Sequence, residues 1–203
     1  MRAPQTRRIP RLLATLVGTL ALGGCTYSIE PVIVAEYATV DLRLVGSWAE
    51  DSSTAHATVT RDTGSTFAIE YTSEDGRQGR FQALLGTLGG RAFIEVWPAP
   101  PHEEARSAHD EMLLPLHLLF AIEIDSTRLR LALLNSDSVV HALRSGDLAI
   151  PHLLSDDDVT LLVGTTAQLR AALPNYVARP GVLEGWAVWS RLPTTTSERS
   201  GDS

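Results

Sequence analysis

The chain has 203 residues, of which 17 are arginine, none is lysine and 24 are aspartate or glutamate, so its formal net charge at pH 7 is −7. This acidic balance argues against a nucleic-acid partner, because binding to phosphate backbones requires a basic surface. The length is sufficient for one domain with a substantial core.

The first 24 residues have the pattern of an export signal. Four arginines, at positions 2, 7, 8 and 11, precede an apolar run over residues 12–22, and no acidic residue occurs before Glu30. At about 1.5 Å per residue, this run reaches only about half-way across a hydrocarbon core of roughly 30 Å. We therefore interpret residues 1–24 as a removable signal peptide. Removing its four arginines leaves 13 against 24 acidic residues, a formal charge of −11.

Cys25 is the single cysteine, and it follows Leu22, Gly23 and Gly24 directly. This arrangement resembles the lipobox of bacterial lipoproteins, which implies cleavage between Gly24 and Cys25, a diacylglyceryl group on the sulfur and acylation of the new amine. More than one chain gives stable anchoring, since each buried methylene contributes about 0.8 kcal/mol. Thr26, where an aspartate would resemble an inner-membrane retention signal, favours the periplasmic face of the outer membrane. The alternative is an ordinary signal peptide, which would leave a spare thiol in an oxidising compartment.

Composition divides the remaining chain into three parts. Residues 25–39 are expected to form the lipidated cysteine and a tether between lipid and domain. Residues 40–192 are expected to form a single β-rich domain, and residues 193–203, which are rich in Thr and Ser, a disordered tail.

Alternation of apolar and polar residues predicts that the domain consists mainly of strands. The clearest case is Arg128–Leu133, where leucines alternate with arginines, and the turn residues 125–127 join it to a preceding strand as a hairpin. In chain order, the pattern predicts strands at 42–48, 56–61, 67–72, 79–88, 91–97, 117–125, 128–134, 147–153, 158–163 and 185–192.

Two segments late in the chain have helical spacing instead. One begins after Ser136 and ends at Gly146, a residue typical of helix C-termini. The other begins with Thr165 and Gln168, which resemble a capping box, and is expected to end at Pro174. Both are short and amphipathic, so we expect them to cover sheet edges or one end of a barrel.

Residues 42–48 read Leu-Arg-Leu-Val-Gly-Ser-Trp, which resembles the Gly-x-Trp opening of lipocalin-like domains, here Gly46 and Trp48. The resemblance implies an antiparallel β-barrel closed at one end by the tryptophan, near an arginine on the last strand for which Arg191 is the counterpart. The chain as a whole resembles uncharacterised bacterial lipoproteins that begin a β-rich domain in this way. The expected fold is therefore mainly β, an antiparallel lipocalin-like barrel or half-barrel with two short helices late in the chain.

The aliphatic face of these strands predicts a concavity for a small apolar molecule or lipid. A non-enzymatic, membrane-anchored binding protein is the first expectation. The alternative is a structural lipoprotein whose barrel is filled by its own side chains and which binds another envelope protein. The residues expected to line the concavity are Phe67, Ile69, Phe81, Leu129, Leu131 and Trp186.

Motifs that suggest catalysis or metal binding have simpler interpretations. Residues 62–65 read Asp-Thr-Gly-Ser, as in aspartic proteases, but no second such motif occurs and a polar hairpin turn explains them. Residues 102–111 contain histidines and acidic residues but lack the spacing of a zinc site. The three aspartates at 156–158 are not followed by the oxygen-rich residues of a calcium loop. No Gly-x-Ser-x-Gly elbow occurs. We expect no catalytic residues, no metal and no cofactor.

Overall fold

The computed structural model describes residues 25–101, 114–155 and 159–193. The predicted signal peptide, the predicted tail beyond residue 193, the acidic triplet 156–158 and the loop at 102–111 lie outside the described residues.

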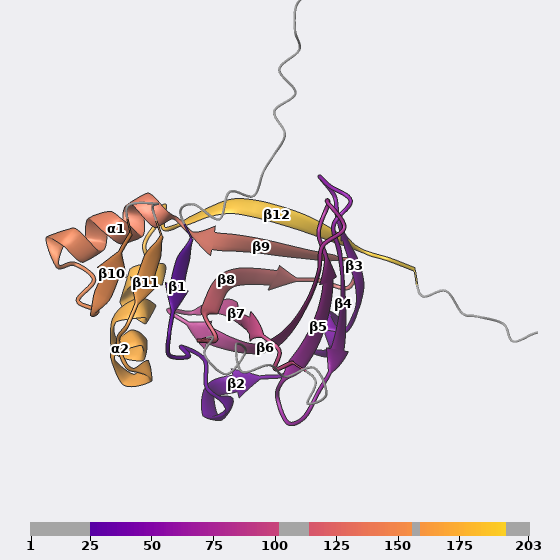
Figure 1. Ribbon diagram of the computed structural model, residues 1–203, viewed down its shortest axis with the longest axis horizontal. Coiled ribbons are helices and arrows are strands. Elements are labelled where there is room, and N and C mark those ends of the chain that lie inside the picture. Colours follow the sequence, from indigo (N-terminus) through magenta and orange to yellow (C-terminus); the bar gives the residue numbers. More distant parts are fainter. Residues whose placement is uncertain (1–24, 102–113, 156–158, 194–203) are drawn as a thin grey trace, which may run out of the picture.

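Eight antiparallel strands form a closed barrel (Figure 1). Neighbours along the chain are neighbours in the sheet from β3 to β9, and β12 closes the ring by pairing with both β9 and β3. The predicted mainly β, antiparallel barrel with two short helices late in the chain is confirmed. The barrel strands are β3 (Gly46–Glu50), β4 (His56–Arg61), β5 (Phe67–Thr72), β6 (Gln78–Leu88), β7 (Arg91–Pro98), β8 (His117–Ile124), β9 (Arg128–Leu134) and β12 (Leu183–Arg191).

Successive side chains of each barrel strand point alternately to the interior and the exterior. The interior holds an apolar cluster to which all barrel strands contribute, and its members pack across the barrel rather than along one strand. This cluster includes Trp48, Val59, Phe67, Ala83, Leu85, Ile94, Ile122, Leu129 and the half-buried Trp189.

A second apolar cluster lies on the outside of strands β6 to β9. Helices α1 (Ser136–Ser145) and α2 (Thr166–Val177) cover it, so the barrel has helices against one side of its wall (Figure 1). The outer cluster includes Leu84, Phe93, Leu119 and Ala132 from the barrel, Val139 and Leu143 from α1, and Leu169 and Leu173 from α2.

Local capping defines the helix ends that the sequence predicts. The Asn135 side chain accepts a hydrogen bond from the Ser138 backbone N–H at 2.7 Å at the start of α1, and Gly146 ends it with φ 81°. Thr165 and Gln168 form the predicted capping box at the start of α2.

The predicted end of the second helix at Pro174 is wrong, because α2 continues to Val177. Proline removes one backbone hydrogen-bond donor from a helix. Tyr176 and Val177 are buried in the outer cluster, so packing of the last turn offsets that loss.

Two predicted strands differ from the structure by more than two residues at one end. Residues at the start of the predicted strand 42–48 form the 3₁₀ helix η2 (Leu42–Leu44), because the Asp41 side chain accepts a hydrogen bond from the Arg43 N–H. The strand predicted at 147–153 is limited to β10 (His152–Leu154), because Leu148 and Ile150 are buried in the outer cluster instead.

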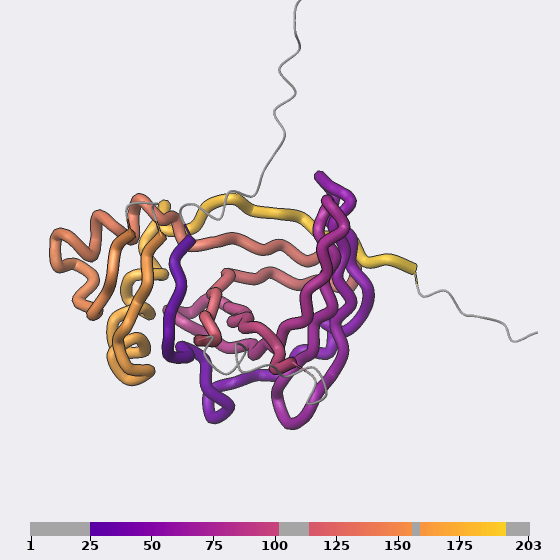
Figure 2. The backbone as a smooth tube through the Cα atoms, viewed as in Figure 1, coloured from indigo at the N-terminus to yellow at the C-terminus, as the bar shows by residue number. Residues whose placement is uncertain are grey.

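Residues 25–39 are not a free tether, contrary to prediction. Strand β1 (Thr26–Ser28) lies between β8 and β11 (Thr160–Leu162), with β10 beyond β11, and Val32 and Ile33 are buried. The chain then continues through the 3₁₀ helix η1 (Ala35–Tyr37) to β2 (Ala38–Thr39), which pairs with β6. Figure 2 shows this indigo segment passing one end of the barrel and then following its wall.

The buried position of Ile33 makes its side chain a test of this attachment. Ile33 is 1% exposed and packs against Gly86 of β6, so Ile33→Ala should lower the free energy of unfolding by about 2–4 kcal/mol in urea titrations. The control Val40→Ala changes a residue that is 45% exposed and should change stability by no more than about 0.5 kcal/mol. Equal, small effects of both variants would show that residues 25–39 do not pack on the barrel.

Candidate functional site

Trp48 and Arg191 close one end of the barrel and lie directly opposite each other on β3 and β12. The Trp48 side chain is fully buried, and its Nε1 donates a hydrogen bond to the Leu44 carbonyl oxygen at 2.9 Å. The guanidinium carbon of Arg191 lies 4.2 Å from the centroid of the Trp48 ring. This geometry is that of a cation–π interaction, which contributes about 0.5–2 kcal/mol. We call this the closed end of the barrel.

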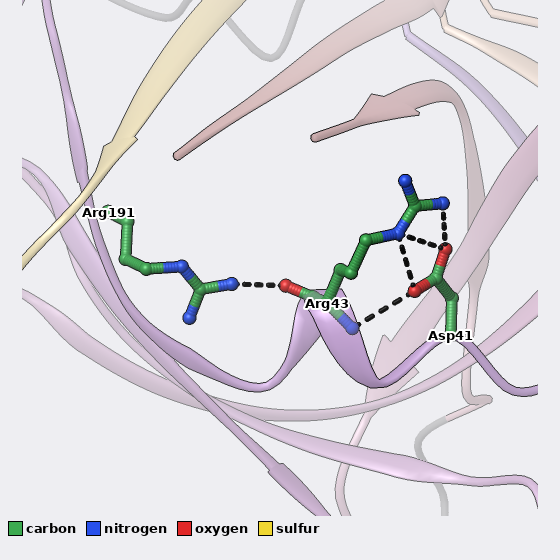
Figure 3. Close-up of polar contacts among 3 residues, drawn as sticks. All are labelled: Asp41, Arg43 and Arg191. Atoms are coloured by element: carbon green, nitrogen blue, oxygen red, sulfur yellow. Dashed lines mark hydrogen bonds and ion pairs between the residues drawn. The ribbon is translucent and has the colours of Figure 1, made fainter. Parts of the chain in front are cut away.

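The Arg191 guanidinium also donates to three backbone carbonyl oxygens. Nη1 donates to Val45 at 2.8 Å and Nε donates to Ser126 at 2.9 Å. Nη2 donates to Arg43, as Figure 3 shows. The carbonyls of residues 43 and 45 lie just before the start of β3, whereas Ser126 lies in the turn between β8 and β9. One side chain therefore connects the first strand, the last strand and a hairpin turn of the barrel.

Gly46 provides the space that this arrangement needs. Its φ is 144°, in a region that favours glycine, and a Cβ atom at this position would overlap the Nη1 atom of Arg191. The structure thus brings Gly46, Trp48 and Arg191 together in one closed-end unit.

A small pocket lies beside the closed end. It has a volume of about 110 Å³ and is lined by Asp41, Arg43, Leu85, Ile122 and Ile124, among others. The Asp41 carboxylate accepts a hydrogen bond from Arg43 Nη2 at 2.6 Å (Figure 3), and this contact lowers the pKa of Asp41. Ligand pockets usually measure about 300–1,000 Å³, so this one is too small for a lipid.

The opposite end of the barrel, from which the connections 99–116 and 135–182 leave, has a different interior. Most inner-face side chains there are apolar and only partly buried. Nearer the closed end, Trp48, Phe67 and Leu129 are buried, although Ile124 is half-buried beside the small pocket. Tyr71 and Trp189 lie together there, with ring centroids 6.4 Å apart. The Nε1 atom of Trp189 is buried and has no hydrogen-bond partner among the described residues. The partly buried set comprises Ile69, Tyr71, Phe81, Val96, Phe120, Leu131 and Trp189.

Five of the six residues predicted to line a concavity lie on the inner face. Phe67 and Leu129 are buried in the inner cluster, so they fill the barrel. Ile69, Phe81 and Leu131 are half-buried and belong to the opposite end.

Trp186 does not join the other five predicted residues. It packs against the outer cluster, and the Arg130 guanidinium lies 4.7 Å from its ring centroid. Alternation along β12 places Trp186 and Val188 on one face of the strand and Trp189 and Arg191 on the other. It does not determine which face points into the barrel. The contact of Arg191 with Trp48 decides this, so Trp189 is the inner tryptophan that sequence reasoning missed.

A buried carboxylate on the outer wall holds the segment that follows β1. Glu95 is 0% exposed, and its two carboxylate oxygens accept hydrogen bonds from the backbone N–H groups of Val32 at 2.8 Å and Ile33 at 2.5 Å. His117 Nδ1 lies 3.4 Å from the Glu95 Oε1 atom. Sequence reasoning missed this contact, because Glu95 interrupts an apolar strand without forming a motif.

Burial shifts both of these titratable groups toward their uncharged forms. It raises the pKa of Glu95 to about 7, against the opposing effects of the two backbone donors and of Arg170. Burial also lowers the pKa of His117, which Glu30 opposes. The contact between Glu95 and His117 is therefore not a simple ion pair near neutral pH.

The remaining sequence motifs have the contacts of ordinary structure. The Asp62 backbone N–H donates to the Thr66 carbonyl at 3.0 Å, and Gln82 donates to its carboxylate at 3.2 Å, as in a hairpin turn. Within residues 25–101, 114–155 and 159–193, no three His, Cys, Asp or Glu side chains are grouped as a metal site would require. No helix in that part of the chain has the length and apolar character needed to cross a membrane.

No family model, curated protein or solved structure matches this chain. The assignment of a function consequently depends on the geometry described above.

Substitution of Gly46 tests the closed-end unit. Gly46→Ala adds a methyl group where Arg191 lies and should lower the free energy of unfolding by about 2–3 kcal/mol in urea titrations. The control Gly181→Ala changes a glycine with φ 77° that has open space around its Cβ position, so it measures backbone strain alone. If the two variants lose equal stability, the close approach of Arg191 is not required.

The pKa of Glu95 predicts a pH-dependent stability. The group titrates near 4.5 in the unfolded chain and near 7 in the fold, so the folded state binds more protons between these values and stability falls as pH rises through them. The difference corresponds to about 3 kcal/mol. Glu95→Gln should remove this dependence, as measured by urea unfolding at several pH values.

His117 Nδ1 lies 3.4 Å from Glu95 Oε1, so the comparison reports the pH dependence of this pair rather than of Glu95 alone. Glu70→Gln, an exposed change of the same kind, is the control. An unchanged pH profile in Glu95→Gln would contradict the assignment.

Proposed function

We propose that this protein is a non-enzymatic lipoprotein of the cell envelope, anchored through acylated Cys25 at the periplasmic face of the outer membrane. Its barrel binds a small apolar molecule or a lipid chain at the end opposite Trp48 and Arg191. No metal or cofactor takes part in this function.

The observation that supports binding is the change in burial along the inner face. Trp48, Phe67 and Leu129 near the closed end are buried, whereas Ile69, Phe81 and Leu131 toward the opposite end are half-buried. Partly exposed apolar side chains on a concave wall gain from contact with an apolar ligand.

The closed-end unit supports the lipocalin-like part of the proposal. The resemblance implies a Gly-x-Trp tryptophan next to an arginine of the last strand, and Trp48 and Arg191 make this contact. A barrel closed at one end leaves the opposite end for entry of a ligand.

A second function has its own supporting observation. The inner cluster already fills the half of the barrel around Trp48, Phe67 and Ile94. A barrel filled in this way suits a structural lipoprotein that binds another envelope protein through its outer surface.

Native mass spectrometry of the full chain, produced in a bacterial host and extracted from its membranes, separates these functions. The binding function predicts a noncovalent apolar molecule on the acylated protein. Ile69→Glu places a carboxylate on the half-buried inner wall of β5 and should abolish this additional mass, because burying a charge beside an apolar ligand is unfavourable.

The control Ala68→Glu changes the neighbouring residue of β5, which lies on the outer face, and should retain the ligand. Circular dichroism establishes that both variants fold. A wild-type protein without additional mass would favour the filled barrel, and equal loss in both variants would place the ligand outside the barrel.

A further inference from the structure

The lipid attachment point has no slack relative to the domain. Strand β1 begins at Thr26, directly after Cys25, and is paired with β11 on one side and β8 on the other. The Cys25 carbonyl oxygen itself accepts a hydrogen bond from the Thr160 N–H at 3.2 Å. An acyl group on Cys25 is therefore attached to the sheet itself and not to a flexible linker.

Hydrogen bonds to the residues that follow β1 in the chain also hold this segment in place. Thr166 donates to the Pro31 carbonyl at 2.8 Å, and Arg170 donates to the Val32 carbonyl at 2.9 Å, both from α2. The Glu95 carboxylate accepts hydrogen bonds from the backbone N–H groups of Val32 and Ile33. The position of Cys25 relative to the barrel is fixed by these contacts.

We call strands β10, β11 and β1, which extend the barrel sheet from β8, the small sheet, and their register aligns apolar side chains with this attachment point. Tyr27 is opposite Leu118 of β8 and Leu161 of β11, and Leu161 is opposite Leu153 of β10. Paired residues on neighbouring strands point to the same face. Tyr27 and Leu161 are half-buried, and Leu153 is 61% exposed. We call Tyr27, Leu161 and Leu153 the apolar row.

The Cys25 side chain lies on the same face as the apolar row. Cys25 and Tyr27 are two residues apart in an extended segment, so their side chains point in the same direction. Burial raises the pKa of Tyr27 to about 12, and the neighbouring Cys25 side chain adds to this shift.

The other face of the small sheet is covered. Thr26, Ser28, Thr160 and Leu162 are buried there, and Leu173 of α2 lies against them. One face of the small sheet is therefore packed against the protein. The other face, which carries the apolar row, is less covered by the described residues.

The apolar row is also continuous with the inner wall of the barrel. Leu118 pairs with Tyr27 and points to the same face of β8 as Phe120. Phe120 packs against the inner cluster of the barrel, at the end opposite Trp48 and Arg191. An apolar surface thus runs from Leu153 at the sheet edge toward the interior of the barrel.

The proposed acylation of Cys25 points to the partner of this surface. Residues 1–24 are the expected removable signal, so the acyl chains on Cys25 place this edge of the sheet at a membrane. The mature chain has a formal charge of −11, so attraction to an anionic surface does not orient the domain, and the exposed apolar row is the feature suited to contact with the bilayer.

We propose that the face of the small sheet carrying the apolar row rests on the lipid bilayer, so that the barrel is held in one orientation with its ligand end toward the membrane. This inference depends on the proposed acylation of Cys25. It predicts that Leu153 enters the bilayer interface.

Depth-dependent fluorescence quenching tests this orientation. The full chain, acylated in a bacterial host, is reconstituted into vesicles of phosphatidylethanolamine and phosphatidylglycerol that contain lipids with a spin label on the acyl chain. Acylated Cys25 does not react with maleimides, so a single introduced cysteine is labelled selectively. The labelled variants are Leu153→Cys in the apolar row, Leu154→Cys on the other face of β10, and Thr60→Cys on β4 near the closed end.

Interfacial apolar residues reach about 5–10 Å into the headgroup and acyl boundary, so the label at 153 should be quenched about twofold or more relative to the labels at 154 and 60. Equal quenching at 153 and 60, whether weak or strong, would overturn the orientation.

Separate incorporation of radiolabelled palmitate tests the anchor. If Cys25→Ser retains the palmitate label, the anchor itself is wrong, whereas a Cys25-dependent label with equal quenching contradicts only the docking face.

Discussion

The structure depends on the position of one guanidinium group, that of Arg191. It lies over the fully buried Trp48 ring and donates to the carbonyls of Arg43, Val45 and Ser126. Strand β12 reaches β3 only after a connection that contains both helices, and the two strands share three paired positions, from Trp48 to Glu50. A closed barrel has no free strand edge, so closure at this junction removes the edges that β3 and β12 would otherwise expose. The Gly46 backbone is part of the same unit because a side chain there would displace Arg191.

The strands with clear alternation were predictable from the sequence. The bounds of β4 and β9 agree with those predicted, because each has one apolar and one polar face. Strand β1 was not predictable, since its buried face is formed by Thr26 and Ser28, and its partner Thr160 is far away in the sequence. Alternation in β12 separated Trp186 from Trp189 but did not identify the inner one, which a contact with β3 decides. The polar contacts of Glu95 likewise depend on a distant segment that packs onto β7.

The two ends of the barrel suit different functions. Around Trp48 the interior is filled, which gives rigidity and one defined closure. Toward the opposite end, half-buried apolar side chains such as Ile69, Phe81 and Leu131 form the surface proposed to bind a ligand. The segment after Cys25 is held on the outer wall by Glu95 and Arg170, so the proposed lipid anchor and the proposed binding end form one rigid unit. The proposed attachment to a membrane thereby lies beside the proposed entry to the barrel.

The most direct measurement of the central interaction is a double-mutant cycle between Arg191 and Trp48. Urea unfolding of wild type, Arg191→Leu, Trp48→Leu and the double variant, each shown to fold by circular dichroism, gives the coupling energy. Residues in direct contact show coupling of about 0.5–3 kcal/mol, and the stacked geometry at 4.2 Å predicts about 1–2 kcal/mol here. Additive losses, within about 0.5 kcal/mol, would show that the two side chains stabilise the barrel independently and that their contact does not close it.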